Sequence, residues 1–137
     1  MRAFYDRVHR EHGLSDPGRI YQRVIGLLQP VPGRRLLDVA CGEGYLLVCA
    51  RRARLRPTGV DLSAEAVRRA RARCPDAALC IGAGERLPFP DGTFDYVTSL
   101  GSLERYRDME RGLDEMARVA APAGSSRLRR PANPPIQ

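Results

Sequence analysis

The sequence predicts an α/β domain built on a mostly parallel β-sheet. The segment at 35–40 is mainly apolar without regular alternation, which is typical of a strand covered on both faces. Strand-like and helix-like segments alternate along the chain, and this order favours parallel strands joined by right-handed crossovers. The composition supports one folded domain, because 43% of the 137 residues are hydrophobic and 28% are charged.

Each expected element has a local signal. Apolar residues at helical spacing predict an amphipathic helix at 17–29, opened by Asp16 and Pro17, within a lead-in that covers 1–32. Ser63 is the expected N-cap of a helix that runs to about Arg73. The other expected elements are helices at 43–54 and 109–119 and strands at 35–40, 58–61, 78–81 and 94–99. The expected core contains Val39, Leu46, Val60, Val67, Leu79, Ile81, Val97 and Met116.

The charge pattern does not indicate a nucleic-acid partner. The net charge is +7 and all 23 basic residues are arginine, a bias that we attribute to overall composition. Several arginines fall at helical spacing among acids, as on a solvated helix face, and no nucleic-acid-binding motif is present. One alternative stays open, a basic nucleic-acid binder that works through Arg127, Arg129 and Arg130.

The cysteines and the hydropathy pattern bear on metal, redox and membrane functions. The four cysteines form no CxxC pair and the two histidines lie far from them, so we expect no metal site and no disulfide framework. Cys41 and Cys80 are expected to be buried packing residues. The N-terminus does not resemble a signal peptide and no apolar run approaches the roughly 20 residues of a membrane span. We therefore expect a cytoplasmic protein without a membrane partner.

The stretch LLDVACGEGYLL at 36–47 indicates a ligand-binding turn. Gly42 and Gly44 follow the first strand and allow the backbone to approach a ligand, while the next helix directs its N-terminal amides toward it. Asp61 ends the second strand about twenty residues downstream, where a carboxylate can accept hydrogen bonds from ribose hydroxyls. The sequence thus predicts a nucleoside-containing ligand.

Two residues favour S-adenosylmethionine over a dinucleotide. The dinucleotide fingerprint has a third glycine where this chain has Leu47. Asp38, just before the turn, is unsuited to a site beside two phosphates but suits a cationic sulfonium or ammonium group.

Four ordered stretches carry a family resemblance: LLDVACGEGYLL, GVDLS, ERLPFPDGTFDYVTSLGSLE and LDEMARVAAPAG. They resemble the motifs of class I S-adenosylmethionine-dependent methyltransferases that act mostly on small molecules, over about 36–124. The resemblance implies a Rossmann-like three-layer α/β/α sandwich, S-adenosylmethionine as cofactor and a small-molecule acceptor. The cofactor-binding residues that it implies are Asp38, Ala40, Gly42, Gly44, Asp61, Leu62, Glu85, Arg86, Leu87, Leu100 and Tyr5.

The chain departs from this family at two places near the expected site. Relatives often have a GDAE pattern after the third strand, where this chain reads GAGE at 82–85, so the contact to adenine is lost or made by Glu85. Arg105 stands where relatives often have histidine, so the resemblance supplies no general base. Glu104 and Tyr106 are candidates for substrate contact or proton removal, and the alternative is that they face solvent where the last helix begins.

The C-terminal sequence predicts a shortened fold. We expect a domain at 1–124 and a flexible, basic, proline-rich tail at 125–137, without counterparts of the family's last three strands. The fourth strand would then be an open edge. The sequence favours an active or once-active methyltransferase domain. The expected alternatives for its length are a truncated or frameshifted form, with reduced or no activity, and a fragment. The alternative is a noncatalytic module that binds the cofactor or pairs with a partner or itself through the open edge.

Overall fold

The computed structural model describes residues 17–100 and 106–122, and within these ranges it contains one parallel four-stranded sheet. The strand order is β3-β2-β1-β4, so the chain builds outward from β1 in one direction and then crosses to its other side. The strands are β1 (Arg35–Val39), β2 (Arg56–Asp61), β3 (Ala78–Ile81) and β4 (Tyr96–Thr98). The predicted parallel sheet is confirmed.

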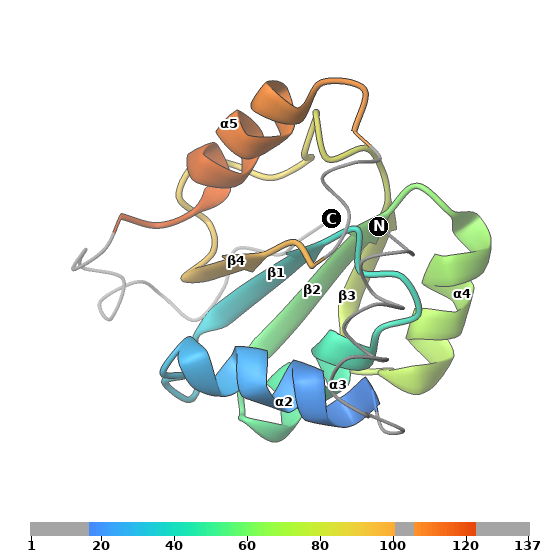
Figure 1. Cartoon of the computed structure of the whole chain (residues 1–137), viewed down its shortest axis with the longest axis vertical. Helices are drawn as coiled ribbons and strands as arrows, with labels where there is room; N and C mark the ends of the chain where they lie inside the picture. Colours follow the sequence, from blue (N-terminus) through green and yellow to red (C-terminus); the bar gives the residue numbers. More distant parts are fainter. Residues whose placement is uncertain (1–16, 101–105, 123–137) are drawn as a thin grey trace.

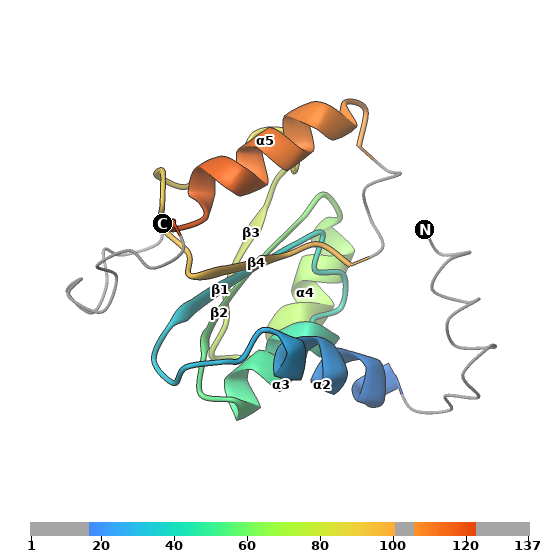
Figure 2. The same ribbon diagram turned by 60° about the vertical axis from the view of Figure 1, so that its left-hand side comes forward.

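Helices cover both faces of this sheet (Figures 1 and 2). On one face lie α2 (Pro17–Leu27), α3 (Tyr45–Arg52) and α4 (Ala64–Arg73), and on the other lies α5 (Met109–Val119). The described residues therefore form the expected three-layer α/β/α sandwich. No helix in these ranges is long and apolar enough to cross a membrane.

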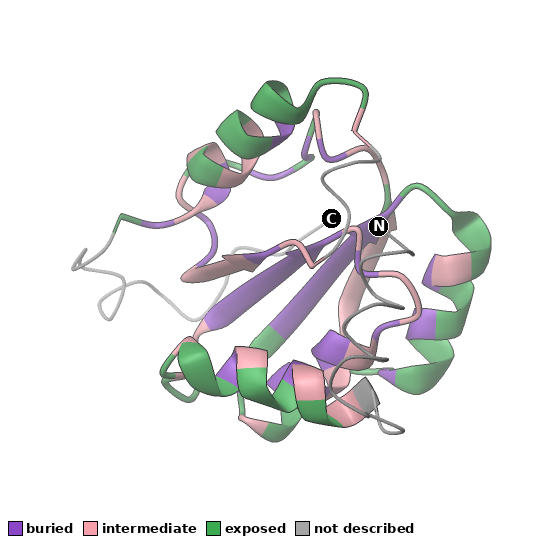
Figure 3. Ribbon diagram, in the orientation of Figure 1, coloured by how far each residue is buried: buried purple, intermediate pink, exposed green. Residues whose placement is uncertain are grey.

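Alternation along the strands divides the core into two clusters, one on each face. Leu36 packs with α2 and α3 residues such as Ile25 and Leu47, whereas Leu37 packs with Phe94 and Val119 on the α5 side. Figure 3 shows that β1 and most of β2 are buried between the layers, while the outer faces of the helices are exposed.

The prediction that Ile81 belongs to the core is wrong. The side chain of Ile81 is 58% exposed, because it ends β3, whose one partner among the described strands is β2. Leu79, Val97 and Met116 are partly buried, and the other expected core residues are buried.

Several element boundaries differ from those expected, for reasons of backbone conformation. Ala40 has φ 60, outside strand geometry, so β1 ends at Val39. Gly44 has φ 88 and precedes α3, which therefore begins two residues later than expected. The first helix ends at Leu27, β2 begins earlier at Arg56, and β4 is limited to Tyr96–Thr98.

The expectation of an open edge beside the fourth strand needs modification. The residues that follow α5 run beside Phe94, and Ala120 forms an isolated parallel bridge with Phe94. The Phe94 N–H donates to the Val119 carbonyl at 2.9 Å, and the Ala121 N–H donates to the Phe94 carbonyl at 2.6 Å. The start of a fifth parallel segment is thus in place. The tail expected at 125–137 lies outside the described residues.

Candidate cofactor site

The turn that follows β1, residues 40–44, is called the glycine turn below. Ala40, Gly42 and Gly44 all have positive φ, at 60°, 55° and 88°. A Cβ on Gly44 would lie 3.0 Å from Ala70 Cβ and 3.1 Å from Ala70 Cα, so glycine is required there for conformation and for packing against α4. No described atom outside its chain neighbours lies within 4 Å of the position that a Cβ would take on Gly42. The turn is therefore closely packed at Gly44 and leaves room for a ligand at Gly42.

Asp61, at the end of β2, holds the glycine turn in place. Its Oδ2 accepts a hydrogen bond from the Gly42 N–H at 2.9 Å, and its Oδ1 accepts one from the Ser63 N–H at 2.9 Å. The side chain is buried, with an exposed fraction of 8%. Each carboxylate oxygen can accept more than one hydrogen bond, so the side chain retains acceptor capacity for ligand hydroxyls. The sequence pointed to Asp61 as a ligand contact but did not reveal its role in shaping the turn.

Asp38, the other acid of the site, is buried near the end of β1. Its Oδ1 accepts a hydrogen bond from the Thr98 hydroxyl at 2.8 Å. The pKa of Asp38 is raised to about 7 as the net result of three effects: desolvation by burial raises it most, the Thr98 hydrogen bond lowers it, and the negative charge of Asp61 raises it. No ion pair among the described residues involves Asp38. A buried acid in this setting gains from a cationic ligand beside it.

Thr98 was not predicted from the sequence. It lies on β4 in register with Asp38, and its side chain is buried. A buried polar residue within an otherwise strand-forming stretch is the signal that could have found it.

Cys41 is a packing residue within the glycine turn, as expected. It is buried, and a Cβ on Gly59 would lie 2.8 Å from the Cys41 Sγ. Burial, followed by the charges of Asp38 and Asp61, raises the pKa of the Cys41 thiol. The thiol is therefore neutral and unreactive. Cys80 is only partly buried.

Tyr106 is packed against the loop that follows β3. A Cβ on Gly84 would lie 2.5 Å from Tyr106 Cζ, and a Cβ on Gly112 of α5 would overlap the ring. The Tyr106 hydroxyl lies 3.3 Å from Ser99 Oγ, which in turn donates to the Val39 carbonyl at 3.1 Å. Either hydroxyl can be the donor in this pair. The interpretation of Tyr106 as a solvent-facing residue is wrong, because its ring joins the loop to α5.

The residues of the expected adenine loop have several different environments. The carboxylate of Glu85 accepts a hydrogen bond from the Arg107 N–H at 3.3 Å, so Glu85 contributes to the loop's own structure. Arg86 is exposed. Leu87 is buried in the α5-side core, and its N–H donates to Glu115 Oε2 at 2.7 Å. The side chain of Leu87 therefore belongs to the core.

The two apolar residues expected near the cofactor lie just beyond strand ends. Leu62 follows β2 and is 66% exposed. Leu100 follows β4, is partly buried, and packs against the core cluster that contains Leu36. Tyr5 and Glu104 lie outside the described residues. The structure thus gathers Asp38, the glycine turn, Asp61 and Leu62 at the carboxyl ends of β1 and β2.

This arrangement defines a class of protein. A parallel sheet with a glycine turn after its first strand, an acid at the end of the second strand and helices on both faces is the Rossmann-like organisation of nucleotide-type ligand sites. Residues 37–128 match the family model described as "Methyltransferase domain", and the chain belongs to this family, whose members are class I methyltransferases. The resemblance inferred from the sequence motifs is confirmed.

Individual relatives agree with this membership. The demethylmenaquinone methyltransferase of Beutenbergia cavernae is 34% identical over 134 residues, which cover 89% of this chain and 54% of that protein. The nocamycin O-methyltransferase of Saccharothrix syringae is 33% identical, over 85% of this chain and 44% of that protein. The crystal structure of the [4+2]-cyclase SpnF is 30% identical with a TM-score of 0.71, over 78% of this chain and 42% of that chain. The chain thus spans about half the length of the curated relatives that it matches.

Proposed function

We propose that this chain binds S-adenosylmethionine at the glycine turn and is a methyltransferase for a small-molecule acceptor. The observation that carries the proposal is the position of Asp38 and Asp61 on either side of the turn, at the carboxyl ends of two adjacent strands. The space beside Gly42 and the absence of a described cationic partner for buried Asp38 both suit a ligand with a positive charge.

Each residue has a distinct role in this proposal. Asp38 supplies the counter-charge for the cationic part of the cofactor. Asp61 fixes the Gly42 N–H and offers its remaining lone pairs to the ribose hydroxyls, while exposed Leu62 lies where an adenine ring could pack. In this proposal the residues next to the bound cofactor also include Ala40, Glu85, Arg86 and Leu100. Tyr5 would fold over the cofactor.

The chemistry makes limited demands on the protein. The cofactor supplies an activated methyl group when bound, so the protein mainly aligns the acceptor. The Tyr106 hydroxyl lies 3.3 Å from Ser99 Oγ, where either group can be the donor, and we do not assign Tyr106 as a general base. We expect an acceptor that is a good nucleophile without proton removal by this residue. We also place the protein in the cytoplasm, since all four cysteines are free.

The first test is a thermal-melt titration with S-adenosylhomocysteine, the demethylated cofactor. At a hundred times the dissociation constant, a ligand adds about 2.7 kcal/mol to the free energy of unfolding, on the order of 10 °C for a domain of this size. We expect a saturable shift in the wild type that Asp61→Ala abolishes. Asp114→Ala, which removes an exposed acid on α5, is the matched control and should keep the shift. A cooperative melt without any shift in the wild type would contradict the proposal.

A second candidate is a module that binds the cofactor without methyl transfer, or that pairs with a second copy. The outer edge of β3, where Ile81 is exposed, favours the pairing version. Light scattering during size-exclusion chromatography tests the pairing version, which a strict monomer at all concentrations would exclude. Cofactor binding without product from a panel of nucleophilic acceptors would favour the noncatalytic version.

A further inference from the structure

Thr98 stands beside Asp38 on the neighbouring strand. The two residues are register partners on β4 and β1, and both are buried. Side chains alternate along a strand, so Asp38 lies on the same face of the sheet as Leu36. Within the described residues, the Thr98 hydroxyl is the one hydrogen-bond partner of the Asp38 carboxylate. The setting of this carboxylate therefore depends on a residue that contacts it from another strand.

The Thr98 hydroxyl has one proton and two acceptors within reach. Its oxygen lies 2.8 Å from Asp38 Oδ1 and 3.4 Å from the Leu37 carbonyl oxygen. It can donate to the carboxylate when Asp38 is ionised, and to the carbonyl when Asp38 is protonated and itself donates. Oδ2 accepts no hydrogen bond from a described residue, so the contact with Thr98 leaves this second oxygen for a ligand.

The other groups around Asp38 do not favour its ionised form. Asp61, at the end of β2, carries a negative charge that disfavours it. Burial, followed by the charge of Asp38, raises the pKa of the Cys41 thiol, which is therefore neutral. The helices on this face contribute apolar, tyrosine and cysteine side chains to the core cluster around Leu36, and these stay neutral below about pH 8. The Thr98 hydrogen bond is thus the described contact that favours ionised Asp38.

We propose that Thr98 is a positioning residue for the cofactor site, which orients the Asp38 carboxylate and favours its ionised form, so that a cationic ligand binds with release of the Asp38 proton. The inference rests on the proposed binding of S-adenosylmethionine, and it adds a link between this binding and pH. In the ligand-free protein the pKa of Asp38 is about 7, so much of the protein carries this proton at and below neutral pH. A cation beside Asp38 favours the ionised form, and the proton leaves to the solvent.

This exchange gives binding a defined pH dependence. Below pH 7 the ligand must displace a proton, so its dissociation constant should decrease by up to about tenfold for each pH unit. Above pH 7 Asp38 is already ionised, and the dissociation constant should become constant. Thr98→Val removes the donor, which raises the pKa of Asp38 and should shift the whole profile by about one pH unit toward higher pH.

Isothermal titration calorimetry of the purified chain with S-adenosylhomocysteine, which retains the ammonium group of the cofactor, tests this inference between pH 5.5 and 8. Titrations in two buffers of different ionisation enthalpy give the number of protons released. We expect the wild type to release about one proton at pH 6 and almost none at pH 8. Thr98→Val should raise the dissociation constant about fivefold or more at pH 7, with a smaller loss at pH 8. Thr98→Ser retains the hydroxyl and should follow the wild-type profile.

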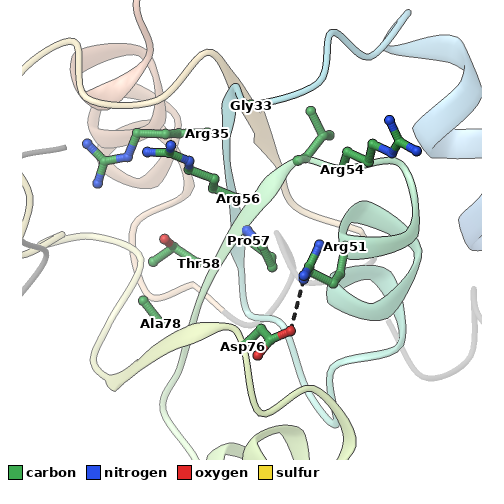
Figure 4. A pocket seen from close by; sticks show the side chains of 10 residues that line it. Gly33, Arg35, Arg51, Arg54, Arg56, Pro57, Thr58, Asp76 and Ala78 are labelled. Carbon is green, nitrogen blue, oxygen red and sulfur yellow. Dashed lines mark hydrogen bonds and ion pairs between the residues drawn. The ribbon is translucent and has the colours of Figure 1, made fainter. Parts of the chain in front are cut away.

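A second buried threonine of the sheet provides the matched control. Thr58 lies on β2 and lines a cavity at the amino ends of the strands, at the other end of the sheet from the glycine turn (Figure 4). Gly33 and Arg56 belong to the same cavity. Thr58→Val also removes one buried hydroxyl, but its dissociation constant should stay within about twofold of the wild type at every pH.

The outcomes separate this inference from the proposed function. Saturable binding without proton release and without pH dependence would overturn the inference and leave the proposed function intact. Equal weakening by Thr98→Val at every pH would also overturn it, because Thr98 would then have a structural role alone. No binding at any pH would remove the proposed function and the inference with it. The wild-type proton count needs no variant, so the test remains decisive even if Thr98→Val does not fold.

Discussion

The Thr98 hydroxyl on β4 lies 2.8 Å from a carboxylate oxygen of Asp38 on β1 and 3.4 Å from the Leu37 carbonyl. When Asp38 is ionised, Thr98 donates its single proton to the carboxylate. When Asp38 is protonated, the acid can donate to Thr98, which then donates to the Leu37 carbonyl. Both protonation states are therefore satisfied, so a buried acid is tolerated here without a cation among the described residues.

This arrangement predicts a pH-dependent stability of the ligand-free protein. The pKa of Asp38 in the folded state is about 7, above its ordinary value of 3.8. Between these two values the folded state binds more protons than the unfolded state, so stability decreases as pH rises through this window. The contribution from Asp38 should decrease by up to about 1.4 kcal/mol per pH unit.

Urea denaturation of the wild type and Asp38→Asn between pH 5 and 8 measures this contribution. Other groups titrate in both proteins, so the quantity to compare is the difference in free energy of unfolding. We expect this difference to favour Asn increasingly as pH rises toward 7. A difference that does not change with pH would mean that Asp38 is ionised throughout this range.

Substitutions at Gly44 and Gly33 allow the cost of lost packing to be measured separately from the cost of an unfavourable backbone conformation. Both have φ 88, but a Cβ on Gly44 would contact Ala70, whereas nothing described lies within 4 Å of a Cβ on Gly33. Gly33→Ala should cost about 1 to 2 kcal/mol for conformation alone. Gly44→Ala should cost about 1 to 3 kcal/mol more, because α4 must shift. Equal losses in urea denaturation would show that α4 yields without cost.

The folded protein should be less stable with alanine than with glycine at position 40. Its φ of 60 is a left-handed conformation that costs a residue with a side chain about 1 kcal/mol relative to glycine. Ala40→Gly should therefore raise the melting temperature by roughly 3 °C. The control Ala117→Gly, at an exposed position within α5, should lower stability by about 1 kcal/mol. A decrease in both variants would mean that the flexibility of the unfolded chain dominates at Ala40.

The fold could be predicted from the sequence because most elements have strong local signals. Ser63 accepts a hydrogen bond from the Ala66 N–H, as expected for an N-cap, and α4 ends at Arg73 as expected. The last helix has the expected bounds, Met109–Val119. The boundaries near the glycine turn were missed because alanine gives no sign of the positive φ at Ala40, which ends β1 early.

The candidate site could be predicted only in part. Asp38 and Asp61 stand at strand ends, so their placement follows from the order of elements. Thr98 and Tyr106 were harder, since their roles depend on contacts across the fold: Thr98 is 60 residues from Asp38, and Tyr106 packs against Gly84 and Gly112. The spacing of residues along the chain does not show which side chains will meet in this way.

Arg118 joins α5 to the loop that follows β3. Its guanidinium pairs with Glu115 at 2.8 Å and Asp91 at 2.9 Å, and it donates to the carbonyls of Phe89 at 2.7 Å and Leu87 at 3.0 Å. Hydrogen bonding to Glu115 and Asp91 raises the pKa of Arg118, so the group is permanently charged. The hydrogen bond from Arg118 lowers the pKa of Glu115 in turn. One side chain thus satisfies two carbonyls of this loop.

Removal of this side chain should loosen the loop beside the candidate cofactor site. Arg118→Ala leaves two partly buried carbonyls without their donor and should reduce the free energy of unfolding by about 2 to 3 kcal/mol. Arg68→Ala, which breaks an exposed pair with Glu65, should cost no more than about 0.5 kcal/mol. Arg118→Lys keeps the charge but cannot make the forked contacts, so urea denaturation should place it between Arg118→Ala and the wild type. Stability of Arg118→Lys equal to that of the wild type would show that charge alone, rather than the geometry of the guanidinium, holds the loop to α5.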